Sequence, residues 1–478
     1  MIVITPKLDM ESKEALYIQL YKYIRNEIME GRMEKNSKLP SIRTLCDHLN
    51  ISRTPVVLAY EQLLAEGYIQ SKDRSGFFIM DIAESSFFSS NTLIEEKNNI
   101  LSSPSRLYHA SKYEEVLYDF GYGSVDLENF PFIKWKKMMN RCLLPESSEL
   151  LLYGDLQGDE ELREEIAVYL HQIRGVRCSP QQIVIGAGTY HSLDLLFQLL
   201  REDVSLLALE KSVNDGVQTL IEQYRFGIHS LELEHDGVRM EDVYKSKAQA
   251  VYVTPSHQFP FGMTMSVNKR IKLLNWANEE QAYIIENDYD GEFRYNSRPI
   301  PSLQSFDQNE RVIYIGTFSK ALTPSFRISY LVLPTRLLER FREKKHSYDQ
   351  LASPIFQKTL QMFMKSGDFE RHMRKMRNLY KKKHDILLQA IHEYLGDNVT
   401  IIGAGSGLHI LLEVRNGMTE DELIESAKQR SVKIYPTSVY ALEGERSAMP
   451  AILLGFGGLS EERIVLGIEQ LKIAWGME

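Results

Sequence analysis

The sequence contains little cysteine and no long apolar stretch. Its three cysteines, Cys46, Cys142 and Cys178, are odd in number and far apart, which excludes a disulfide framework and the spacing of a cysteine metal site. No segment reaches the roughly 18 unbroken apolar residues of a transmembrane helix. The first residues, MIVITPKLDM, lack the basic start and apolar core of a signal peptide. We therefore expect a cytoplasmic protein without a membrane segment.

Positive charge is also in short supply. Lys and Arg number 56 against 65 Asp and Glu, a net charge of −9, which excludes a protein that coats nucleic acid with its whole surface. Residues 1–80 differ from the rest, with 11 basic and 10 acidic side chains, and residues 35–60 hold four basic side chains against one acidic. A small basic face on an acidic body is typical of a local DNA contact.

The chain has 478 residues, which suggests two or three domains. Three helical patterns fill its first eighty residues. Apolar residues recur at helical spacing before Gly31, over 42–49 and over 53–66. Ser41 and Ser52 are the expected N-caps of the second and third helices. Only two residues, Asn50 and Ile51, separate these helices. The pattern predicts a helix-turn-helix, whose second helix presents its N-terminal side chains to the major groove of DNA.

The segment GYIQSKDRSGFFI predicts two short strands around a basic tip, the wing of a winged helix. From periodicity alone, a plain three-helix module with a hairpin fits equally well. Residues 39–79 resemble the winged-helix domain of the GntR family, except at Pro55, where that family usually has threonine. Val57 is placed to contact a thymine methyl group. The resemblance implies DNA contacts by Arg43, Ser52, Arg53, Thr54, Val57, Lys72, Arg74 and Gly76.

A Ser- and Asn-rich segment, residues 81–116, predicts a linker between residues 1–80 and residues 117–478. A flexible chain of this length spans about 30–35 Å, enough to reach a partner subunit. From residue 117 onward, short β-branched runs such as QQIVIGAGT alternate with helical patterns such as YHSLDLLFQLL. The alternation predicts a mostly parallel sheet with helices on both faces. We expect a large part over about 117–345 and a small part over about 346–478.

Lys320 stands in YIGTFSKALTPSFRISY, a stretch of apolar and small residues. A lysine most often makes a surface salt bridge, but a lysine with a lowered pKa is a nucleophile toward aldehydes. The strand, turn and helix start in IVIGAGTYHSLDLL offer backbone N–H groups to a phosphate, although such turns are mostly only turns. Together these elements favour a pyridoxal phosphate site, with phosphate contacts from Gly188, Thr189, Thr317, Ser319 and Arg327 and a contact to the phenolic oxygen from Tyr289.

Residues 119–478 resemble a type I aminotransferase in segments such as YGDLQGDEELREEIAVYL, VTPSHQFPFG and GTFSKALTPSFRISYLVLP. With the GntR-like reader, the whole chain resembles the MocR/GabR family of transcriptional regulators. The resemblance implies an N-terminal α+β winged helix-turn-helix joined to an α/β type I aminotransferase fold. It further implies that Lys320 binds pyridoxal phosphate as a Schiff base, that Tyr289 bonds its O3′, that Ser319 and Arg327 hold its phosphate, and that His257 lines the site. A domain-swapped, head-to-tail homodimer is also implied.

The chain departs from this family beside the cofactor ring. The family has aspartate two residues before the tyrosine, where this chain has Asn287 followed by Asp288. Residues two apart on a strand share a face, so we expect Asn287 to accompany Tyr289. A strand that ended earlier would instead turn Asp288 toward the ring. A neutral amide would not keep the pyridine nitrogen protonated, which would make the ring a poorer electron sink.

Two further departures concern the effector. The segment LEKSVNDG lacks the family's stacking tyrosine and the nearby arginine that in GabR grips the effector's carboxylate, and it has Asn214 and Asp215 or Gly216 instead. Met449 stands where GabR has an arginine. Losing both arginines removes the bidentate fork suited to a carboxylate. We therefore expect an effector other than γ-aminobutyrate.

Three functions remain open on the sequence. The leading hypothesis is a DNA-binding regulator of transcription that binds paired half-sites on double-stranded promoter DNA and senses pyridoxal phosphate, alone or with an amine-bearing ligand. The first alternative is a true aminotransferase with an appended domain, which the intact lysine motif favours and Asn287 opposes. The second is a cofactor-free aminotransferase fold that serves only as a dimerisation scaffold.

Overall fold

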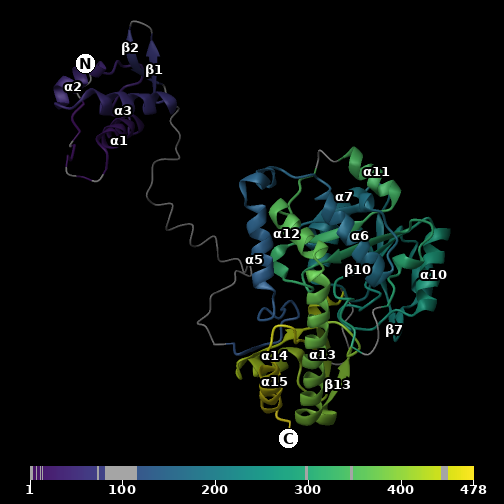
Figure 1. The fold of residues 1–478 in the computed structure, drawn as a ribbon. Helices are drawn as coiled ribbons and strands as arrows, with labels where there is room; N and C mark the ends of the chain where they lie inside the picture. The colour runs from purple at the N-terminus through teal and green to yellow at the C-terminus, as the bar shows by residue number, and fades with distance from the viewer. Residues whose placement is uncertain are drawn as a thin grey trace. The chain divides into compact units, whose positions relative to one another are not determined.

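The computed structural model describes residues 4–6, 8–10, 12, 14–72, 75–80, 116–295, 300–344, 348–442 and 450–477. Some of the residues discussed above lie outside these ranges: Arg74, nearly all of the predicted linker, Met449 and the predicted boundary at residues 345–346. The chain divides into two compact units, Met1–His109 and Ala110–Glu478 (Figure 1). Within the described part of the chain, none of the helices combines the length and apolar character needed to cross a membrane.

The first unit is a winged helix-turn-helix, as predicted. Its core packs apolar side chains of all three helices, including Leu20, Ile24, Val56 and Leu63. The Ser41 hydroxyl accepts a hydrogen bond from the N–H of Thr44 and so caps the second helix. The elements are α1 (Leu16–Met29), α2 (Ile42–Leu49), α3 (Arg53–Ala65) and an antiparallel wing of β1 (Ile69–Lys72) and β2 (Gly76–Ile79).

A seven-stranded sheet forms the centre of the second unit. β12 runs antiparallel to both of its neighbours and the other strand pairs are parallel, which confirms the prediction of a mostly parallel sheet. The strands, in spatial order, are β4 (Ile183–Gly186), β12 (Ser329–Val332), β11 (Val312–Thr317), β10 (Tyr283–Asp288), β9 (Ala250–Val253), β5 (Leu206–Glu210) and β6 (Gly227–Leu231).

Helices cover both faces of this sheet because successive strand residues point to opposite sides. Val184 joins one hydrophobic cluster, whereas its neighbours Ile183 and Ile185 join another. The first face is covered by α7 (Thr189–Leu200), α8 (Asp215–Gln223) and α11 (Thr335–Glu343). The opposite face is covered by α5 (Phe132–Cys142), α6 (Glu160–Arg174), α9 (Met240–Ser246), α10 (Val267–Glu279) and α12 (Pro354–Lys365).

The C-terminal part builds a smaller sheet that is joined to the large part by the 27-residue helix α13 (Asp368–Tyr394) (Figure 1). Helices α14 (Glu420–Lys428) and α15 (Glu461–Ala474) pack on this sheet. Its strands, in order, are β13 (Val399–Ile402), β14 (His409–Val414), β17 (Ala451–Gly455) and β16 (Tyr435–Pro436). Two short pairs complete the unit, β3 (Tyr118–Asp119) with β15 (Val432–Lys433) and β7 (Leu233–Glu234) with β8 (Gly237–Val238).

Candidate functional site

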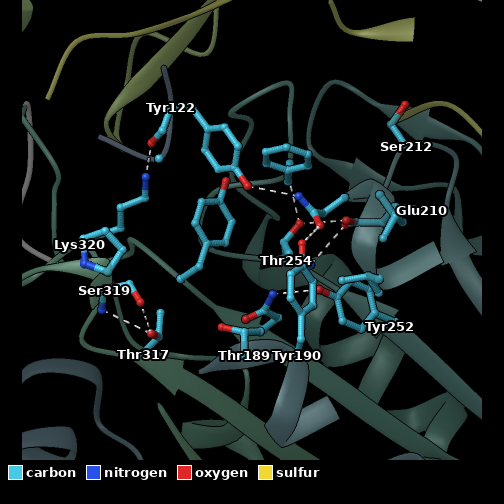
Figure 2. Close-up of a pocket in the computed structure, with 18 of the residues that line it drawn as sticks. Tyr122, Thr189, Tyr190, Glu210, Ser212, Tyr252, Thr254, Thr317, Ser319 and Lys320 are labelled. Carbon is cyan, nitrogen blue, oxygen red and sulfur yellow. Dashed lines mark hydrogen bonds between the residues drawn. The ribbon is translucent and has the colours of Figure 1, made fainter. Parts of the chain in front are cut away.

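A cavity of about 200 Å³ opens where β5, β9, β10 and β11 end (Figure 2). Carboxyl ends of parallel strands meet at one sheet edge, which is where open α/β sheets bind ligands. Lining groups from sequence-predicted positions are Thr189, Asn287, Tyr289, Thr317, Ser319, Lys320 and Arg327. Lining groups that sequence reasoning missed include Tyr122, Tyr190, Glu210, Ser212, Tyr252, Thr254 and Phe259.

Lys320 reaches the cavity from the turn after β11. Its side chain is buried, and its ammonium group donates a hydrogen bond to the carbonyl of Tyr122 and lies 4.7 Å from the centroid of the Tyr122 ring. Burial lowers the pKa of Lys320 to about 8, against a smaller opposing influence of Asp290. Because charged groups are disfavoured in such surroundings, an appreciable fraction of Lys320 is a free amine near neutral pH. A free amine is the form that attacks an aldehyde.

The groups predicted to hold a phosphate converge on the start of α7. Gly188 has φ of 94°, and a Cβ at this position would lie 2.0 Å from Nη2 of Arg327, so only glycine lets the guanidinium approach the helix start. Thr317 Oγ1 and Ser319 Oγ are 2.9 Å apart on the neighbouring turn. Helix N–H groups, hydroxyls and a guanidinium together form a donor set that fits a phosphate group.

Asn287 lines the cavity and Asp288 does not. Asn287 lies on the same side of the chain as Tyr289 and donates a hydrogen bond from Nδ2 to the Tyr252 hydroxyl at 2.7 Å. The Oδ1 of Asn287 is buried and has no hydrogen-bond partner among the described residues. This placement follows from the alternation of side chains along β10.

The structure corrects the prediction that Asp288 could face the cofactor ring, because the Asp288 side chain lies on the opposite face of β10. There, Asp288 Oδ2 accepts hydrogen bonds from Nε of Arg174 at 2.7 Å and from the hydroxyl of Tyr314 at 2.6 Å. The Arg174 and Asp288 side chains are nearly inaccessible to solvent. β10 extends through Asp288, so this carboxylate is committed to a buried ion pair away from the cavity.

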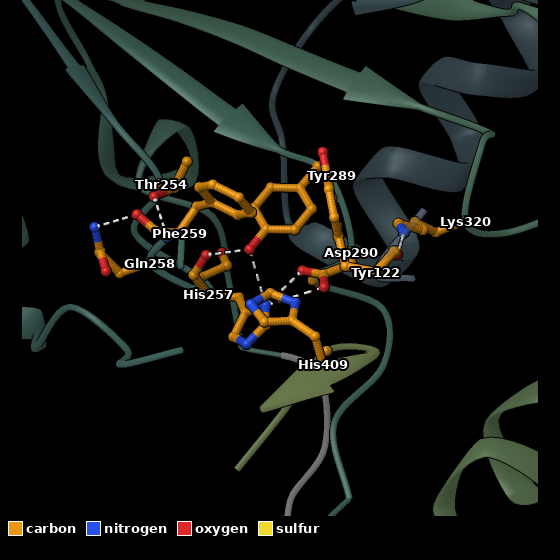
Figure 3. A network of polar contacts seen from close by, with 12 residues as sticks. Tyr122, Thr254, His257, Gln258, Phe259, Tyr289, Asp290, Lys320 and His409 are labelled. Carbon is orange, nitrogen blue, oxygen red and sulfur yellow. Dashed lines mark hydrogen bonds and ion pairs between the residues drawn. The ribbon is translucent and has the colours of Figure 1, made fainter. Parts of the chain in front are cut away.

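His257 is likewise not among the lining side chains, contrary to its predicted place. Its ring lies behind Tyr289, with Nδ1 at 2.9 Å from Oδ1 of Asp290, and both partners are almost fully buried (Figure 3). The Tyr289 hydroxyl donates to the backbone carbonyl of His257 at 3.1 Å. His409 from the small sheet packs its ring 4.8 Å from that of His257. The histidine therefore contacts the Tyr289 hydroxyl without lining the cavity itself.

Two tyrosines occupy the region where the family's stacking tyrosine is missing. Asn214 donates from Nδ2 to the Tyr122 hydroxyl at 3.1 Å and accepts from the Tyr190 hydroxyl through Oδ1. Tyr122 comes from the segment after β3, and Tyr190 from the first turn of α7. Their sequence separation hid them, because no local pattern relates them to residue 214.

Glu210, at the end of β5, is the single acidic side chain among the described residues that line the cavity. Its Oε2 accepts hydrogen bonds from the Thr254 hydroxyl at 2.8 Å and from Gln258 Nε2 at 3.3 Å. Burial raises the pKa of Glu210 to about 7, although these hydrogen bonds oppose the rise. The carboxyl therefore changes charge near neutral pH.

The predicted DNA-contact residues lie on the solvent side of the first unit. Arg43, Ser52, Arg53 and Thr54 are exposed, and Val57 is half-buried. Ser52 holds the N-cap position of α3, but its hydroxyl makes no capping hydrogen bond, which differs from the expected cap and leaves the hydroxyl open to solvent. In the wing, Lys72 is exposed, with its ammonium 4.8 Å from the centroid of the Phe78 ring, and Gly76 has φ of 106°.

Two stretches of the chain match known families. Residues 16–79 match the gntR family of bacterial regulatory proteins, and residues 116–447 match aminotransferase class I and II. A solved multiple substrate aminotransferase from Thermococcus profundus shares the fold, with a TM-score of 0.69 at 24% identity over 83% of this chain and 97% of that one. A gntR-type winged helix joined to this fold defines a class of DNA-binding transcriptional regulators with an aminotransferase-like domain.

Relatives share this organisation over nearly their whole length. The HTH-type transcriptional regulator YdeL of Bacillus subtilis is 43% identical over 472 residues, which are 99% of each chain. The probable rhizopine catabolism regulatory protein MocR of Rhizobium meliloti is 29% identical over 98% of this chain and 95% of its own. PdxR of Corynebacterium glutamicum, an HTH-type pyridoxine biosynthesis transcriptional regulator, is 28% identical over 93% of each. This chain belongs to the MocR/GabR family of transcriptional regulators.

Proposed function

We propose that this regulator binds pyridoxal phosphate at Lys320 and changes its occupancy of promoter DNA in response. The observation that carries the proposal is the buried amine of Lys320, with a pKa of about 8, in one cavity with Arg327, Thr189 and Ser319. These groups fit an aldehyde and a phosphate on one small molecule. When bound, pyridoxal phosphate supplies the aldehyde and an electron-accepting ring. The residues of this chain bind and orient it.

The same cavity argues for sensing rather than turnover. Efficient transamination needs a protonated ring nitrogen, and a carboxylate beside it maintains that proton. The group on the Tyr289 side of β10 is instead the amide of Asn287, which is hydrogen-bonded to a tyrosine hydroxyl. A hydroxyl both donates and accepts, so the Asn287–Tyr252 pair can satisfy an uncharged nitrogen. We infer a sensor with little or no aminotransferase activity.

The effector is the cofactor itself, alone or with an amine-bearing ligand. The name of PdxR connects that relative to pyridoxine biosynthesis, which supports a role for pyridoxal phosphate as a signal. Among the described residues of the cavity, the cationic side chains are Lys320 and Arg327, both assigned to the cofactor. γ-Aminobutyrate would therefore lack a partner for its carboxylate among these described residues.

We further propose a head-to-tail homodimer in which each winged helix packs on the partner subunit. Apolar side chains are exposed on α5 and on the segment after it: Phe132 at 63%, Ile133 at 87%, Leu151 at 66%, Leu152 at 70% and Tyr153 at 97%. An exposed apolar patch of this kind is typical of a protein interface. Two winged helices in one dimer would bind paired half-sites, and a change in their spacing would alter DNA affinity.

A footprint tests the proposal. The full-length protein would be bound to a DNA fragment that it has selected from random sequences, with and without pyridoxal phosphate. We expect the protected region or the protein concentration needed for half-protection to change when the cofactor is added. A footprint unaffected by the cofactor, with a colourless protein, would favour the scaffold alternative. Rapid turnover of amino acids would favour the enzyme.

Cofactor uptake should depend on pH through Lys320. Burial lowers the pKa of this amine to about 8, so below that pH the free amine falls about tenfold per pH unit, and above about pH 9 nearly all of it is free. Stopped-flow absorbance of Schiff base formation should therefore rise about tenfold from pH 6 to pH 7 and level off above about pH 8.5. A rate still rising steeply between pH 9 and pH 10 would show an ordinary lysine.

Arg53→Ala tests whether α3, the second helix of the helix-turn-helix, contacts DNA. The exposed guanidinium at the first residue of α3 is placed to contact phosphate or a base edge. We expect DNA affinity to fall about tenfold and, for a phosphate contact, the slope of log K against log salt to decrease by about one. Fluorescence anisotropy over a salt series measures both quantities. Lys272→Ala, an exposed lysine of α10, is the control and should change neither; an equal loss there would indicate a nonspecific effect of charge.

A further inference from the structure

Cofactor binding would occupy both cationic side chains among the described residues of the cavity and leave an acidic one. Of the described residues that line it, Lys320, Arg327 and Glu210 carry titratable charge. The two cations are assigned to the aldehyde and the phosphate under the proposed function, on which this inference rests. The other described lining side chain that changes charge near neutral pH is the acid Glu210. A ligand carboxylate would then enter without a cationic partner among the described lining residues, which is unfavourable in a buried site.

One place in the cavity already holds an ammonium group. The Nζ of Lys320 lies 4.7 Å from the centroid of the Tyr122 ring and donates to the Tyr122 carbonyl. A cation at this distance over a ring face is attracted by the quadrupole of the ring. When the lysine nitrogen is joined to the cofactor, it no longer occupies this place as an ammonium group. The ring face and the carbonyl oxygen of Tyr122 then become available to another cation.

The Tyr122 ring is held firmly for such a role. Its hydroxyl is fixed by Asn214, whose other side-chain atom is bonded to Tyr190. Its ring packs 5.4 Å from the ring of Phe259 and 6.1 Å from that of His409 (Figure 3). Tyr122, Tyr190 and Phe259 all line the cavity, and Figure 2 labels the first two. A fixed ring binds a cation without the entropy cost of ordering it first.

We propose that the cofactor-loaded cavity recognises a primary amine that carries no carboxylate, and that Tyr122 binds its ammonium group. The aromatic side chains beside Tyr122 suit an apolar body on this amine. The proposal concerns recognition before any covalent change. It assigns the ammonium group to Tyr122, and it attributes discrimination against amino acids to the lack of a cationic partner for the carboxylate among the described lining residues.

Matched pairs of ligands test the proposal directly. The members of each pair differ by the carboxylate: tyramine and tyrosine, 2-phenylethylamine and phenylalanine, isobutylamine and valine. The full-length protein, loaded with pyridoxal phosphate, would be titrated with each ligand while its visible absorbance and its DNA affinity are followed. We expect each amine to half-saturate at about tenfold lower concentration than its amino acid. Equal or reversed preference would overturn the inference.

Two variants of one side chain locate the effect. Tyr122→Phe keeps the ring and should bind the amines as the wild type does, whereas Tyr122→Leu removes the ring and should raise the amine concentration at half-saturation about tenfold. The visible Schiff base band reports whether each variant still binds the cofactor. Undiminished amine binding in Tyr122→Leu would show that the amine binds elsewhere.

A third variant covers the case in which Tyr122→Leu fails to fold. Asn214→Arg places a guanidinium at the same part of the cavity and should reverse the preference toward amino acids, since a carboxylate then has a partner. An unchanged preference in Asn214→Arg would overturn the inference. A wild-type protein that never becomes coloured with pyridoxal phosphate would instead overturn the proposed function, so the two failures are distinct.

Discussion

Lys320→Ala is expected to abolish covalent cofactor binding and every effect of pyridoxal phosphate on DNA occupancy. After borohydride reduction, intact mass measurement should show one added cofactor per wild-type chain and none in the variant. The reason is chemical, because the buried amine of Lys320 is the one amine among the described side chains that line the cavity. DNA binding without the cofactor should remain, since the winged helix is a separate compact unit with its own core.

Two further variants make this result specific. Lys320→Arg keeps a positive charge at the site but cannot form a Schiff base, so it should behave like Lys320→Ala in the mass measurement. Lys272→Ala removes an exposed lysine from α10 and should leave the wild-type mass addition and the cofactor response intact. A reduced adduct that persists in Lys320→Ala, or is absent from saturated wild type, would contradict the assignment of the lysine.

Asn287→Asp is expected to raise the rate of transamination. A carboxylate on the cavity side of β10 would favour a protonated ring nitrogen through a charge-assisted hydrogen bond, which is worth about 1.5–3 kcal/mol. If that energy stabilises the transition state of transamination, the rate should rise about 10- to 100-fold. Formation of keto acid from common amino acids, measured under single-turnover conditions, would report it. The wild-type rate should be near the detection limit.

Asn287→Ala provides the control for this gain. It removes the amide and its bond to Tyr252 without adding charge, so any rate increase from a looser cavity alone would appear in it as well. We expect no increase in Asn287→Ala. An Asn287→Asp rate equal to that of wild type would mean that residue 287 does not meet the ring nitrogen, and the argument against an enzyme would lose its main support.

The predictions that the structure bears out come from local pattern. Helical spacing and the two-residue turn determined the helix-turn-helix, and β-branched runs between helical patterns determined the sheet. One cavity receives Thr317, Ser319, Lys320 and Arg327 because all four lie between the last residue of β11 and the start of β12. Alternation along β10 was enough to place Asn287 beside Tyr289. In each case the residues that determine the feature lie close together in the sequence.

The errors and omissions involve contacts between distant segments. Asp288 is held by Arg174, 114 residues away, and His257 by Asp290 behind Tyr289. No periodicity encodes which residue will face a given side chain across two packed layers. The burial that raises the pKa of Glu210 to about 7 is a property of the assembled strands. A sequence lists the ionisable groups, but their surroundings decide their charge.

The sequence by itself determined the two-part organisation and the family and singled out Lys320, since these depend on composition, spacing and short motifs. Only the tertiary structure decided what surrounds that lysine: Tyr122 against its ammonium group, Asn214 between two tyrosines, and Glu210 as the one acid among the described lining residues. The physical reason is that desolvation, ring contacts and ion pairing act through space at a few ångströms. Folding brings those neighbours from segments as far apart as residues 122 and 320.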